Sequence, residues 1–383
     1  MSVQPSPLRP SLPPEIFIVA GETSGDMQAA HLVRALHRDA PPLDVHGVGG
    51  SYMAEAGVRL FLDSSTWGAI GYVEPFLRLP SYLRWLRQVE QEIRRRRPSL
   101  LVLVDFPGFN LPLAKRVRSI VPILYYFPPM VSVRRGDRAR RVAALRMRLL
   151  AVLRREEAAY QAAGANVQFI GHPAVDQVRL QWDEATARAQ FELSPTVAVV
   201  GLLPGSRIQE IRAHLPVLLA AAALLRQTTP QLEFVLPVPA THLRPLVTQL
   251  VSQLGVPVRI VSAVYDAMAV CRVLVVSSGS ATLEAAILGI PMVTIYRLPW
   301  LSAFIVRRFI TTPYVALPNL LADREIVPEL LQERMTPQGI ADAVNRLLSD
   351  PVKWTWVRSE LLAVAQDLGE PGAISRAAQE VQR

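Results

Sequence analysis

The chain has 383 residues, half of them hydrophobic and 19% charged, so we expect two globular domains with sizeable cores rather than a disordered chain. Its single cysteine, Cys271, excludes an internal disulfide framework and a thiolate zinc cluster, and no His, Cys and Asp residues have metal-ligand spacing. The formal net charge is +9, but no recognisable nucleic-acid module accompanies it, so nucleic acid is disfavoured as a partner.

The N-terminus predicts a flexible tail and no secretory signal. Residues 1–14 hold five prolines and lack a basic start followed by an apolar stretch. No apolar run approaches the roughly 18 residues of a membrane span, and the longest, Leu215 to Leu225, predicts a buried helix. We therefore expect a cytoplasmic protein, either free or peripheral on a membrane.

The first half of the chain alternates short apolar runs with helical patterns. Glycines follow the first two runs, and Asp105 ends the third. Strands that alternate with helices in this way predict an α/β domain with a parallel sheet. The expected strands are 15–20, 43–48, 100–104 and 123–126, and the expected helices are about 26–38, 79–97 and 111–120.

The same alternation begins again in the second half. Strands are expected at 196–203, 232–236, 258–261, 273–276 and 291–296, with helices from the loop 204–207 to 225, at 281–288 and from 337 onward. We divide the chain into a flexible tail (1–14), an N-terminal domain (15–180), a C-terminal domain (181–345) and C-terminal helices that cross between the domains (346–383).

Two α/β domains that face each other predict a cleft with a site on each side, because ligands bind outside the carboxyl ends of parallel strands. A dinucleotide-binding enzyme would carry Gly-x-Gly-x-x-Gly after its first strand. Residues 21–26 are instead Gly-Glu-Thr-Ser-Gly-Asp, which disfavours a nicotinamide enzyme. No nucleophile elbow is present, which disfavours a hydrolase.

Two strand-to-helix loops of the second half suit a diphosphate. In the first, Gly205 permits close backbone approach, Ser206 can donate a hydrogen bond, and Arg207 can grip a diphosphate, although an ordinary turn with an exposed arginine fits equally. The second, 277–284, offers small hydroxyl residues at another helix N-terminus. Its Glu284 either accepts hydrogen bonds from a ribose or favours the helix start electrostatically.

The polar residues of the first half suggest an acceptor side. Asp105 ends a buried strand, where its carboxylate either faces the cleft as a general base or serves as a cap or turn residue. Glu22 and Asp26 flank the first loop and either hold acceptor hydroxyls or cap the following helix. His172 lies near the domain boundary, and a lone histidine of this kind is more often structural than catalytic.

Basic residues cluster in two segments. Residues 134–155 hold nine arginines with Asp137 as the only acid, and 94–97 are all arginine. They form either a solvated helix face or a surface for an anionic membrane or substrate. The amphipathic stretch 79–89 either dips into a membrane interface or buries Trp85 in the core.

A series of short motifs follows a recognisable order along the chain. The motifs are Val19–Asp26, Gly47–Gly50 with Met53 and Gly57, Asp105–Asn110, Gly171–Pro173, Leu203–Arg207, Ser278–Ala285, Pro313–Ala322 and Val327–Gln332. Together they resemble the lipid-A-disaccharide synthase family, glycosyltransferase family 19, from about residue 15 to 365. The last three motifs are specific, whereas the glycine loops alone are not.

The resemblance implies a GT-B fold, which is two Rossmann-like domains with a cleft between them, and an inverting transfer that needs no metal or other cofactor. The family moves 2,3-diacylglucosamine from UDP onto 2,3-diacylglucosamine 1-phosphate and so makes the β-1,6-linked disaccharide of lipid A. It works at the inner face of the cytoplasmic membrane, and its members can form dimers through swapped C-terminal segments. A peripheral membrane protein and a homodimer are therefore expected.

The resemblance also assigns roles by position. It implies that Asp105 is the base on the acceptor hydroxyl and that Arg207 stabilises the leaving diphosphate. Glu284 would hold the ribose, and Ser280 and Thr282 the phosphates. The remaining expected site residues are Gly205, Ser206 and Asn319 on the donor side and Glu22, Ser24, Asp26 and Asn110 on the acceptor side.

Two departures from the family pattern lie in the acceptor half. The family usually carries Val-Trp-Ala-Trp after Tyr-Val-Ser-Pro, whereas here Tyr126–Pro129 is followed by Met-Val-Ser-Val, and Gly108 stands where a second acid is common. They leave open a different acyl chain, a different acceptor or reduced activity. The alternatives are a UDP-sugar transferase or UDP-GlcNAc 2-epimerase-like enzyme with another acceptor, or a catalytically weakened UDP-sugar- or lipid-binding homologue.

Overall fold

The computed structural model describes residues 15–39, 43–64, 79–132, 137–298 and 313–383, and the prediction of a flexible tail at 1–14 lies outside them. Contacts within the chain divide it into two units. Unit 1 runs to Gly171 and includes the last residues, 372–383, and unit 2 runs from His172 to Pro371. The contacts thus divide the chain a little before the boundary expected at 180.

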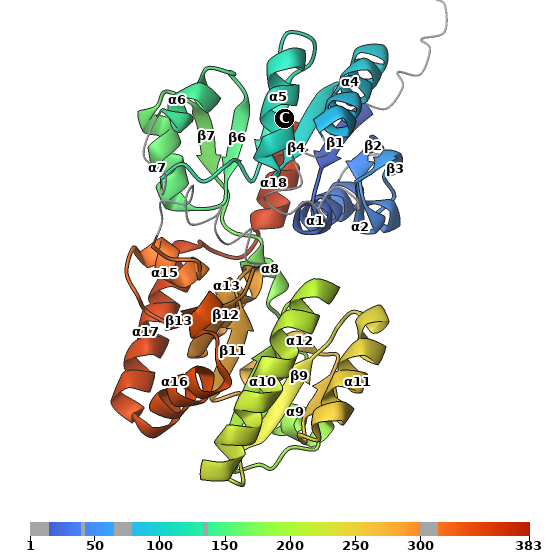
Figure 1. The fold of residues 1–383 in the computed structure, drawn as a ribbon. Coiled ribbons are helices and arrows are strands. Elements are labelled where there is room, and N and C mark those ends of the chain that lie inside the picture. Colours follow the sequence, from blue (N-terminus) through green and yellow to red (C-terminus); the bar gives the residue numbers. More distant parts are fainter. Residues whose placement is uncertain (1–14, 40–42, 65–78, 133–136, 299–312) are drawn as a thin grey trace, which may run out of the picture. The chain divides into compact units, whose positions relative to one another are not determined.

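Unit 1 is a parallel sheet in the order β3-β2-β1-β4-β5-β6-β7, with helices on its faces (Figure 1). Its central strands are buried apolar runs, as a sheet covered on both faces requires. The strands are β1 (Glu15–Ala20), β2 (Asp44–Gly49), β3 (Arg59–Asp63), β4 (Leu100–Val104), β5 (Ile123–Tyr126), β6 (Arg148–Ala151) and β7 (Asn166–Phe169). The helices are α1 (Thr23–Asp39), α2 (Ser51–Glu55), α4 (Leu79–Arg96), α5 (Pro107–Val117), α6 (Arg138–Ala143), α7 (Arg154–Ala162) and α18 (Ala373–Gln382).

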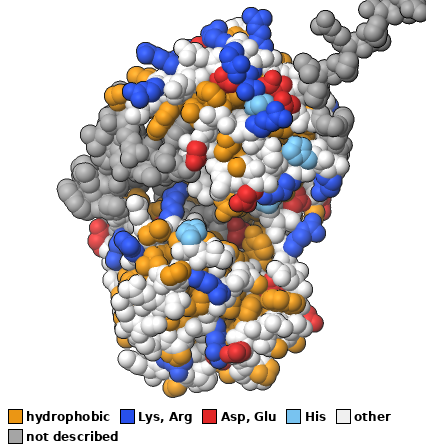
Figure 2. All heavy atoms as spheres, turned by 90° about the vertical axis from the view of Figure 1, so that its right-hand side faces the viewer, with side chains coloured by type: hydrophobic (Ala, Val, Ile, Leu, Met, Phe, Trp, Pro, Cys, Tyr) orange, Lys and Arg blue, Asp and Glu red, His pale blue; other side chains and the backbone are white. Residues whose placement is uncertain are grey.

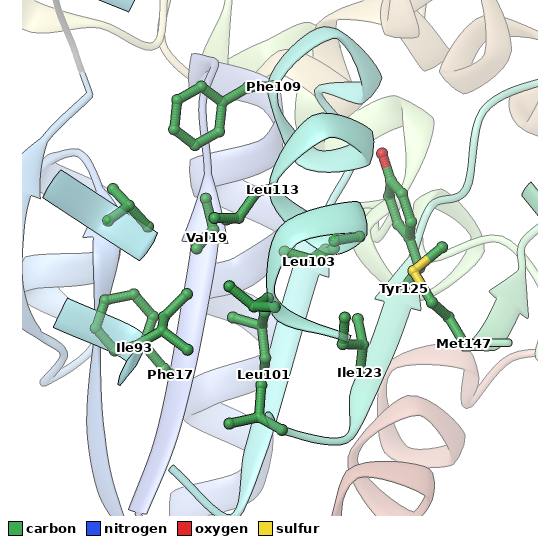
Figure 3. Close-up of a cluster of buried hydrophobic side chains, with 14 of the residues drawn as sticks. Phe17, Val19, Ile93, Leu101, Leu103, Phe109, Leu113, Ile123, Tyr125 and Met147 are labelled. Atoms are coloured by element: carbon green, nitrogen blue, oxygen red, sulfur yellow. The ribbon is translucent and has the colours of Figure 1, made fainter. Parts of the chain in front are cut away.

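The core of unit 1 lies between this sheet and the helices that cover it. Figure 3 shows α5 beside β1, β4 and β5, with Phe109 and Leu113 among side chains of the strands. Both residues are fully buried, and α4 adds Ile93 to the same cluster. Burying such a side chain contributes roughly 1.5–3 kcal/mol, so α5 is fixed firmly over β4, the strand that leads into Asp105.

Unit 2 is a second parallel sheet, in the order β10-β9-β8-β11-β12-β13. Its strands are β8 (Val199–Leu203), β9 (Glu233–Pro237), β10 (Arg259–Val261), β11 (Val273–Ser277), β12 (Met292–Tyr296) and β13 (Glu329–Leu331). Its helices are α8 (Ala174–Gln177), α9 (Glu184–Gln190), α10 (Ile208–Thr228), α11 (Arg244–Leu254), α12 (Val264–Ala269), α13 (Ser280–Leu288), α15 (Leu317–Ala322), α16 (Pro337–Ser349) and α17 (Pro351–Asp367), with 3₁₀ turns at Thr241–Leu243 and Gln332–Arg334.

Helix α10 is the one described helix that is long and apolar enough to cross a membrane by length and composition. The same test is passed by core helices, and α10 has the burial of one. Leu215, Leu218 and Leu219 are fully buried, and the helix packs against α16. The interpretation of Leu215 to Leu225 as a buried helix therefore accounts for its apolar sequence.

The C-terminal helices divide between the units. Helices α16 and α17 belong to unit 2, where α17 packs on α13. Helix α18 belongs to unit 1 and packs on α1. The expected crossing of 346–383 is thus limited to the short connection before α18.

Each sheet has one topological switch point, where strands that follow one another in the chain move away in opposite directions. In unit 1 it lies between β1 and β4, which pair from Ile16–Leu100 to Ala20–Val104. In unit 2 it lies between β8 and β11, which pair from Val273–Val200 to Val276–Leu203. Ligands of open α/β sheets bind at this point, outside the carboxyl ends of the strands. The segments after these four strands carry Glu22, Asp105, Arg207 and Glu284, whereas Asn319 follows β12.

Candidate active site

Asp105 lies at the switch point of unit 1 in a strained backbone conformation. Both Asp105 and Phe106 have φ of 48°, in the left-handed region that side chains other than glycine rarely adopt. Phe106 also packs against the β1 loop, where a Cβ atom added to Gly21 would lie 1.9 Å from its ring. Strain of this kind persists only where surrounding contacts impose it, which makes the turn a candidate functional feature.

Two side chains hold this turn through the carbonyl oxygen of Asp105. Asn110 Nδ2 donates to it at 2.7 Å and Tyr125 Oη donates at 2.7 Å. Asn110 is fully buried, and its amide also reaches the carbonyl oxygens of Val19 and Val104 at 3.4 and 3.2 Å. Asn110, predicted to face the acceptor, therefore ties β1 to β4 and supports the backbone of Asp105.

The carboxyl group of Asp105 is tuned toward accepting a proton. Burial, with a smaller contribution from the negative charge of Glu22, raises the pKa of Asp105 to about 6, although a backbone hydrogen bond from Phe106 opposes the shift. A carboxylate with a pKa close to the working pH is suited to general base catalysis. Glu22 is half-buried, and its negative charge acts on the Asp105 carboxyl group, so these two predicted site residues interact electrostatically.

Asp26 and Ser24 lie in the first turn of α1 but differ in their surroundings. The buried carboxylate of Asp26 accepts the N–H groups of Gly50, Tyr52 and Met53 at 2.8, 3.1 and 3.1 Å. It therefore caps α2, rather than its own helix as the sequence suggested, and its acceptor oxygens are committed there. Ser24 is exposed and stays a candidate for ligand contact.

The donor-side loop follows β8 at the switch point of unit 2. Gly205 has φ of 113°, and a Cβ atom there would lie 2.3 Å from Oε2 of Glu210. That same oxygen accepts the N–H groups of Ser206 and Arg207 at 3.0 and 3.3 Å. The guanidinium of Arg207 is half exposed and 3.7 Å from Glu210. The side chain of Arg207 is thus available to an anion, whereas the two loop N–H groups already bind a carboxylate.

A second polar side chain of α10 supports the same loop. His214 is fully buried, and its Nδ1 lies 2.8 Å from the carbonyl oxygen of Pro204. Because a carbonyl only accepts, Nδ1 carries the hydrogen, which leaves Nε2 to accept the N–H of Arg297 at 3.2 Å. The hydroxyl of Tyr296 donates to Glu210 Oε1 at 3.3 Å. Sequence reasoning missed Glu210, His214 and Tyr296, because their roles depend on which strands become neighbours.

The loop after β11 combines one buried hydroxyl with an exposed serine and a half-buried glutamate. Thr282, predicted to bind phosphate, is fully buried, donates to the carbonyl oxygen of Gly279 at 2.7 Å and accepts the N–H of Leu317 at 3.3 Å. Ser280 is exposed. Burial raises the pKa of the half-buried Glu284, and a hydrogen bond from Ser280 opposes the shift. Ser280 and Glu284 therefore remain the candidates for donor contact in this loop.

Asn319, predicted on the donor side, has its amide fully committed inside unit 2. Its Nδ2 donates to the carbonyl oxygen of Val327 at 2.8 Å and to Glu329 Oε1 at 2.9 Å. Its Oδ1 accepts the N–H groups of Ile326 and Val327 at 2.7 and 2.9 Å. The side chain is fully buried and holds the 326–329 segment against α15, which leaves it no free hydrogen for a ligand.

The segment after β5, where the family tryptophans are missing, is anchored to α7. The buried carboxylate of Glu156 accepts the N–H of Val131 at 2.6 Å and both the N–H and the hydroxyl of Ser132. Tyr160 Oη donates to the carbonyl oxygen of Pro129 at 2.8 Å. This backbone is therefore rigidly placed as far as Ser132, and residues 133–136 lie outside the described part.

The arginine-rich segment does not form one helix face. Arg134 and Arg135 lie outside the described residues, and the others are spread over α6, the turn after it, β6 and α7. Arg155 Nε donates to Ser132 Oγ at 2.8 Å, and the guanidinium of Arg154 lies over the Phe169 ring at 4.6 Å. Figure 2 views the right-hand side of Figure 1, away from α6 and α7, and on that face basic side chains lie in several places with acidic ones beside some of them.

In the second basic run, at the end of α4, three of the four arginines form ion pairs with glutamates. Arg94 pairs with Glu90 at 2.9 Å, and Glu92 pairs with Arg95 at 2.6 Å and Arg96 at 2.5 Å. Hydrogen bonds from the two arginines lower the pKa of Glu92 to about 2, mainly through Arg95. Most of this run is therefore a network of ion pairs, to which Glu15 of β1 contributes by pairing with Arg96 at 2.9 Å.

His172 has a structural place, in agreement with the sequence interpretation. Its Nδ1 accepts the N–H of Ala174 at 3.1 Å, and burial lowers its pKa to about 4, so the ring stays neutral. Among the described residues, no three His, Cys, Asp or Glu side chains lie close enough together to hold a metal ion. At the switch points the structure places Asp105 with Glu22 in unit 1, and Arg207, Glu210 and Glu284 in unit 2.

Comparison with known proteins gives one consistent family. The sequence profile of a family described as lipid-A-disaccharide synthetase matches residues 16–381. The lipid-A-disaccharide synthase of Geobacter sulfurreducens is 38% identical over 365 residues, which are 95% of each chain.

Two solved structures are similar in fold at low sequence identity. A putative UDP-N-acetylglucosamine 2-epimerase from Listeria monocytogenes superposes with a TM-score of 0.63 at 9% identity and covers 97% of this chain and 95% of its own. The calicheamicin glycosyltransferase CalG4 gives 0.60 at 18% identity and covers 97% of this chain and 98% of its own. The expected fold of two Rossmann-like domains is thereby confirmed.

Proposed function

The chain belongs to the lipid-A-disaccharide synthase family, glycosyltransferases of lipid A biosynthesis, and from this premise we propose that it transfers 2,3-diacylglucosamine from UDP to 2,3-diacylglucosamine 1-phosphate. The proposal rests on one observation: each of the two switch points carries a group suited to one half of the transfer reaction. A carboxylate with a raised pKa lies at one, and a glycine loop with an accessible arginine lies at the other.

We assign the donor to unit 2. When the bond between the anomeric carbon and the diphosphate breaks, negative charge develops on the departing UDP. The guanidinium of Arg207 is placed to neutralise that charge, and two N–H···O bonds to a phosphate make the interaction directional. Glu284, at the neighbouring β11 loop, would accept hydrogen bonds from the ribose hydroxyls, and Ser280 would contact a phosphate.

We assign the acceptor to unit 1. The carboxylate of Asp105 would take the proton of the acceptor 6-hydroxyl as that oxygen attacks the anomeric carbon on the side opposite UDP. The new bond therefore has the inverted, β configuration. The raised pKa of Asp105 makes it a stronger base than an ordinary aspartate and leaves it deprotonated above about pH 6.

We further propose that the exposed face of α4 contacts an anionic membrane surface. Pro80, Leu83, Arg84, Arg87, Gln88 and Gln91 line an open groove of about 460 Å³ on this helix. Leu83 is 37% exposed, and neither Arg84 nor Arg87 forms an ion pair within the described part of the chain. An apolar side chain flanked by cations suits a lipid headgroup layer.

The membrane proposal is tested by vesicle flotation. Wild-type protein should float with vesicles that contain phosphatidylglycerol, and the double variant Arg84→Glu/Arg87→Glu should remain unbound. The control Arg244→Glu/Arg259→Glu changes the same charge at exposed sites of unit 2 and should still float. Equal flotation of both double variants would show that α4 is not the contact surface.

The catalytic assignments are tested by separating donor binding from turnover. Arg207→Ala should weaken UDP binding in calorimetry and also slow the reaction, because it removes a group that binds the diphosphate in both states. Asp105→Ala should leave UDP affinity within about threefold of wild type and abolish the release of UDP from the complete reaction mixture. The opposite pattern would reverse the two roles.

A further inference from the structure

The loop that carries Arg207 is held by two side chains one turn apart on α10. Glu210 binds the N–H groups of Ser206 and Arg207 through a single oxygen, Oε2. His214 binds the carbonyl oxygen of Pro204 through Nδ1. Both ends of the loop are therefore attached to the helix that follows it, and the glycine at 205 is what lets the carboxylate approach so closely.

The same two side chains connect the loop to another strand. Tyr296, the last residue of β12, donates to the second oxygen of Glu210, and the N–H of Arg297 binds Nε2 of His214. The imidazole ring of His214 also packs edge-on against Tyr296, with ring centroids 5.5 Å apart. Because β11 lies between β8 and β12 in the sheet, these contacts fix the loop after β8 relative to a strand beyond its neighbour.

We propose that Glu210 and His214 are positioning residues for the transfer reaction. They clamp the loop so that the donor diphosphate is bound by the side chain of Arg207, while the N–H groups of Ser206 and Arg207 stay bound to Glu210. This inference rests on the proposed function, and it adds that the carboxylate stays in place when the donor binds. The clamp reduces the ordering cost of binding, because the loop already has its bound conformation.

Glu210 either holds the loop in place or competes with the donor diphosphate for the N–H groups of Ser206 and Arg207. Two variants of Glu210 distinguish these roles. The two loop N–H groups share one oxygen of Glu210, and the other oxygen accepts the Tyr296 hydroxyl and lies 3.7 Å from the Arg207 guanidinium. In Glu210→Gln the amide oxygen can keep both N–H bonds, and the amide NH₂ can donate to the Tyr296 hydroxyl after that hydroxyl rotates. This variant removes the charge and preserves the clamp, whereas Glu210→Ala removes both.

The experiment measures the UDP dissociation constant by calorimetry and the KM and kcat for the UDP-sugar donor. For Glu210→Ala we expect UDP binding to weaken and the donor KM to rise, each by about tenfold, which corresponds to about 1.4 kcal/mol. For Glu210→Gln we expect both values within about threefold of wild type. A matched control is Asp350→Ala, which removes another helix-capping carboxylate of unit 2, bound to the N–H of Lys353 at 2.9 Å, and should change neither constant.

Each outcome decides the proposal. If both Glu210 variants bind UDP more tightly than wild type, the carboxylate competes with the diphosphate and the clamp is refuted. If Glu210→Ala binds UDP as wild type does, or if Asp350→Ala weakens binding equally, the effect is not specific to the loop and the clamp is again refuted. If wild-type protein binds UDP but makes no disaccharide, the proposed acceptor is wrong while the clamp remains supported by the binding data. If wild type binds no UDP, both fail.

Discussion

Replacing Asp105 with asparagine should abolish catalysis and at the same time make the fold more stable at neutral pH. Burial and the charge of Glu22 raise the pKa of Asp105 from 3.8 to about 6. A carboxyl group whose pKa is raised in the folded state binds its proton more tightly there than in the unfolded chain. Its contribution to stability is therefore fully present below pH 3.8 and is lost as the pH rises through 6.

The size of this penalty follows from the shift. A difference of about two pKa units at roughly 1.4 kcal/mol per unit gives about 3 kcal/mol at pH 8. This figure is an upper limit on the free energy that the ionised carboxylate costs the fold. Asp105 is half-buried, so nearby water can relax differently around the aspartate and the asparagine. Asparagine has nearly the same shape and carries no charge, so Asp105→Asn should recover part of this free energy at pH 8 and almost none at pH 4.

Urea denaturation at several pH values measures the effect. The free energy of unfolding of Asp105→Asn minus that of wild type should be near zero at pH 4, rise between pH 4 and 6, and level off at about 1–3 kcal/mol. Asp183→Asn is a control of opposite sign. The exposed Asp183 caps α9 by accepting the N–H of Thr186, and this bond lowers its pKa, so its stabilising contribution is present at neutral pH and lost in acid.

A loss of stability in Asp105→Asn at pH 8 would refute this reasoning. It would mean that the carboxylate makes favourable interactions in the folded state that outweigh its burial, and a base with a raised pKa would then have no physical basis. The pH dependence of kcat/KM in the wild-type enzyme gives an independent check, because activity should fall below about pH 6 as Asp105 is protonated.

Three further predictions separate scaffold residues from binding residues. Thr282→Val should lower the free energy of unfolding by about 1–2 kcal/mol, because it removes two buried hydrogen bonds. The UDP affinity of the folded protein should not change. A tenfold loss of UDP affinity in calorimetry would show that Thr282 contacts the donor. Asn319→Ala should cost about 3 kcal/mol in urea denaturation, because it leaves buried backbone groups of 326–327 unpaired; a cost below about 1 kcal/mol would contradict that role. Asp26→Ala should cost about 2 kcal/mol by uncapping α2, while exposed Ser24→Ala should be neutral in the same assay.

The sequence predicted the central architecture well because the central strands are buried on both faces. Residues 100–104 and 123–126 were expected as strands and are β4 and β5 with the same bounds. Four other strands were missed, namely β3, β6 and β7 in unit 1 and β13 in unit 2, whereas the edge strand β10 was expected at 258–261. In β3 and β7 half-exposed side chains alternate with exposed ones over only four or five residues, and β6 lies within the arginine-rich segment. Short strands of this kind form because neighbouring strands offer hydrogen bonds, which no local pattern reveals.

The sequence indicated where the candidate site lies, but not which of its residues face a ligand and which support the fold. Glu22, Asp105, Arg207 and Glu284 each follow a strand at a switch point, and this could be inferred from the order of strands and loops. Whether a polar side chain faces a ligand or the protein depends on contacts across the sequence, as with Asp26 capping a helix 24 residues away. In the loop predicted to bind a diphosphate, the N–H groups of Ser206 and Arg207 are held by Glu210, which the sequence shows only as a glutamate in the first turn of a helix.

The most direct test of the central claim is to incubate the purified protein with UDP-2,3-diacylglucosamine and 2,3-diacylglucosamine 1-phosphate and to examine the products by mass spectrometry. The account predicts one molecule of tetraacylated disaccharide 1-phosphate for each UDP released, joined by a β-1,6 linkage, and none with Asp105→Asn. A protein that binds UDP tightly but yields no disaccharide, or that converts the UDP-sugar without the acylated acceptor, would contradict it.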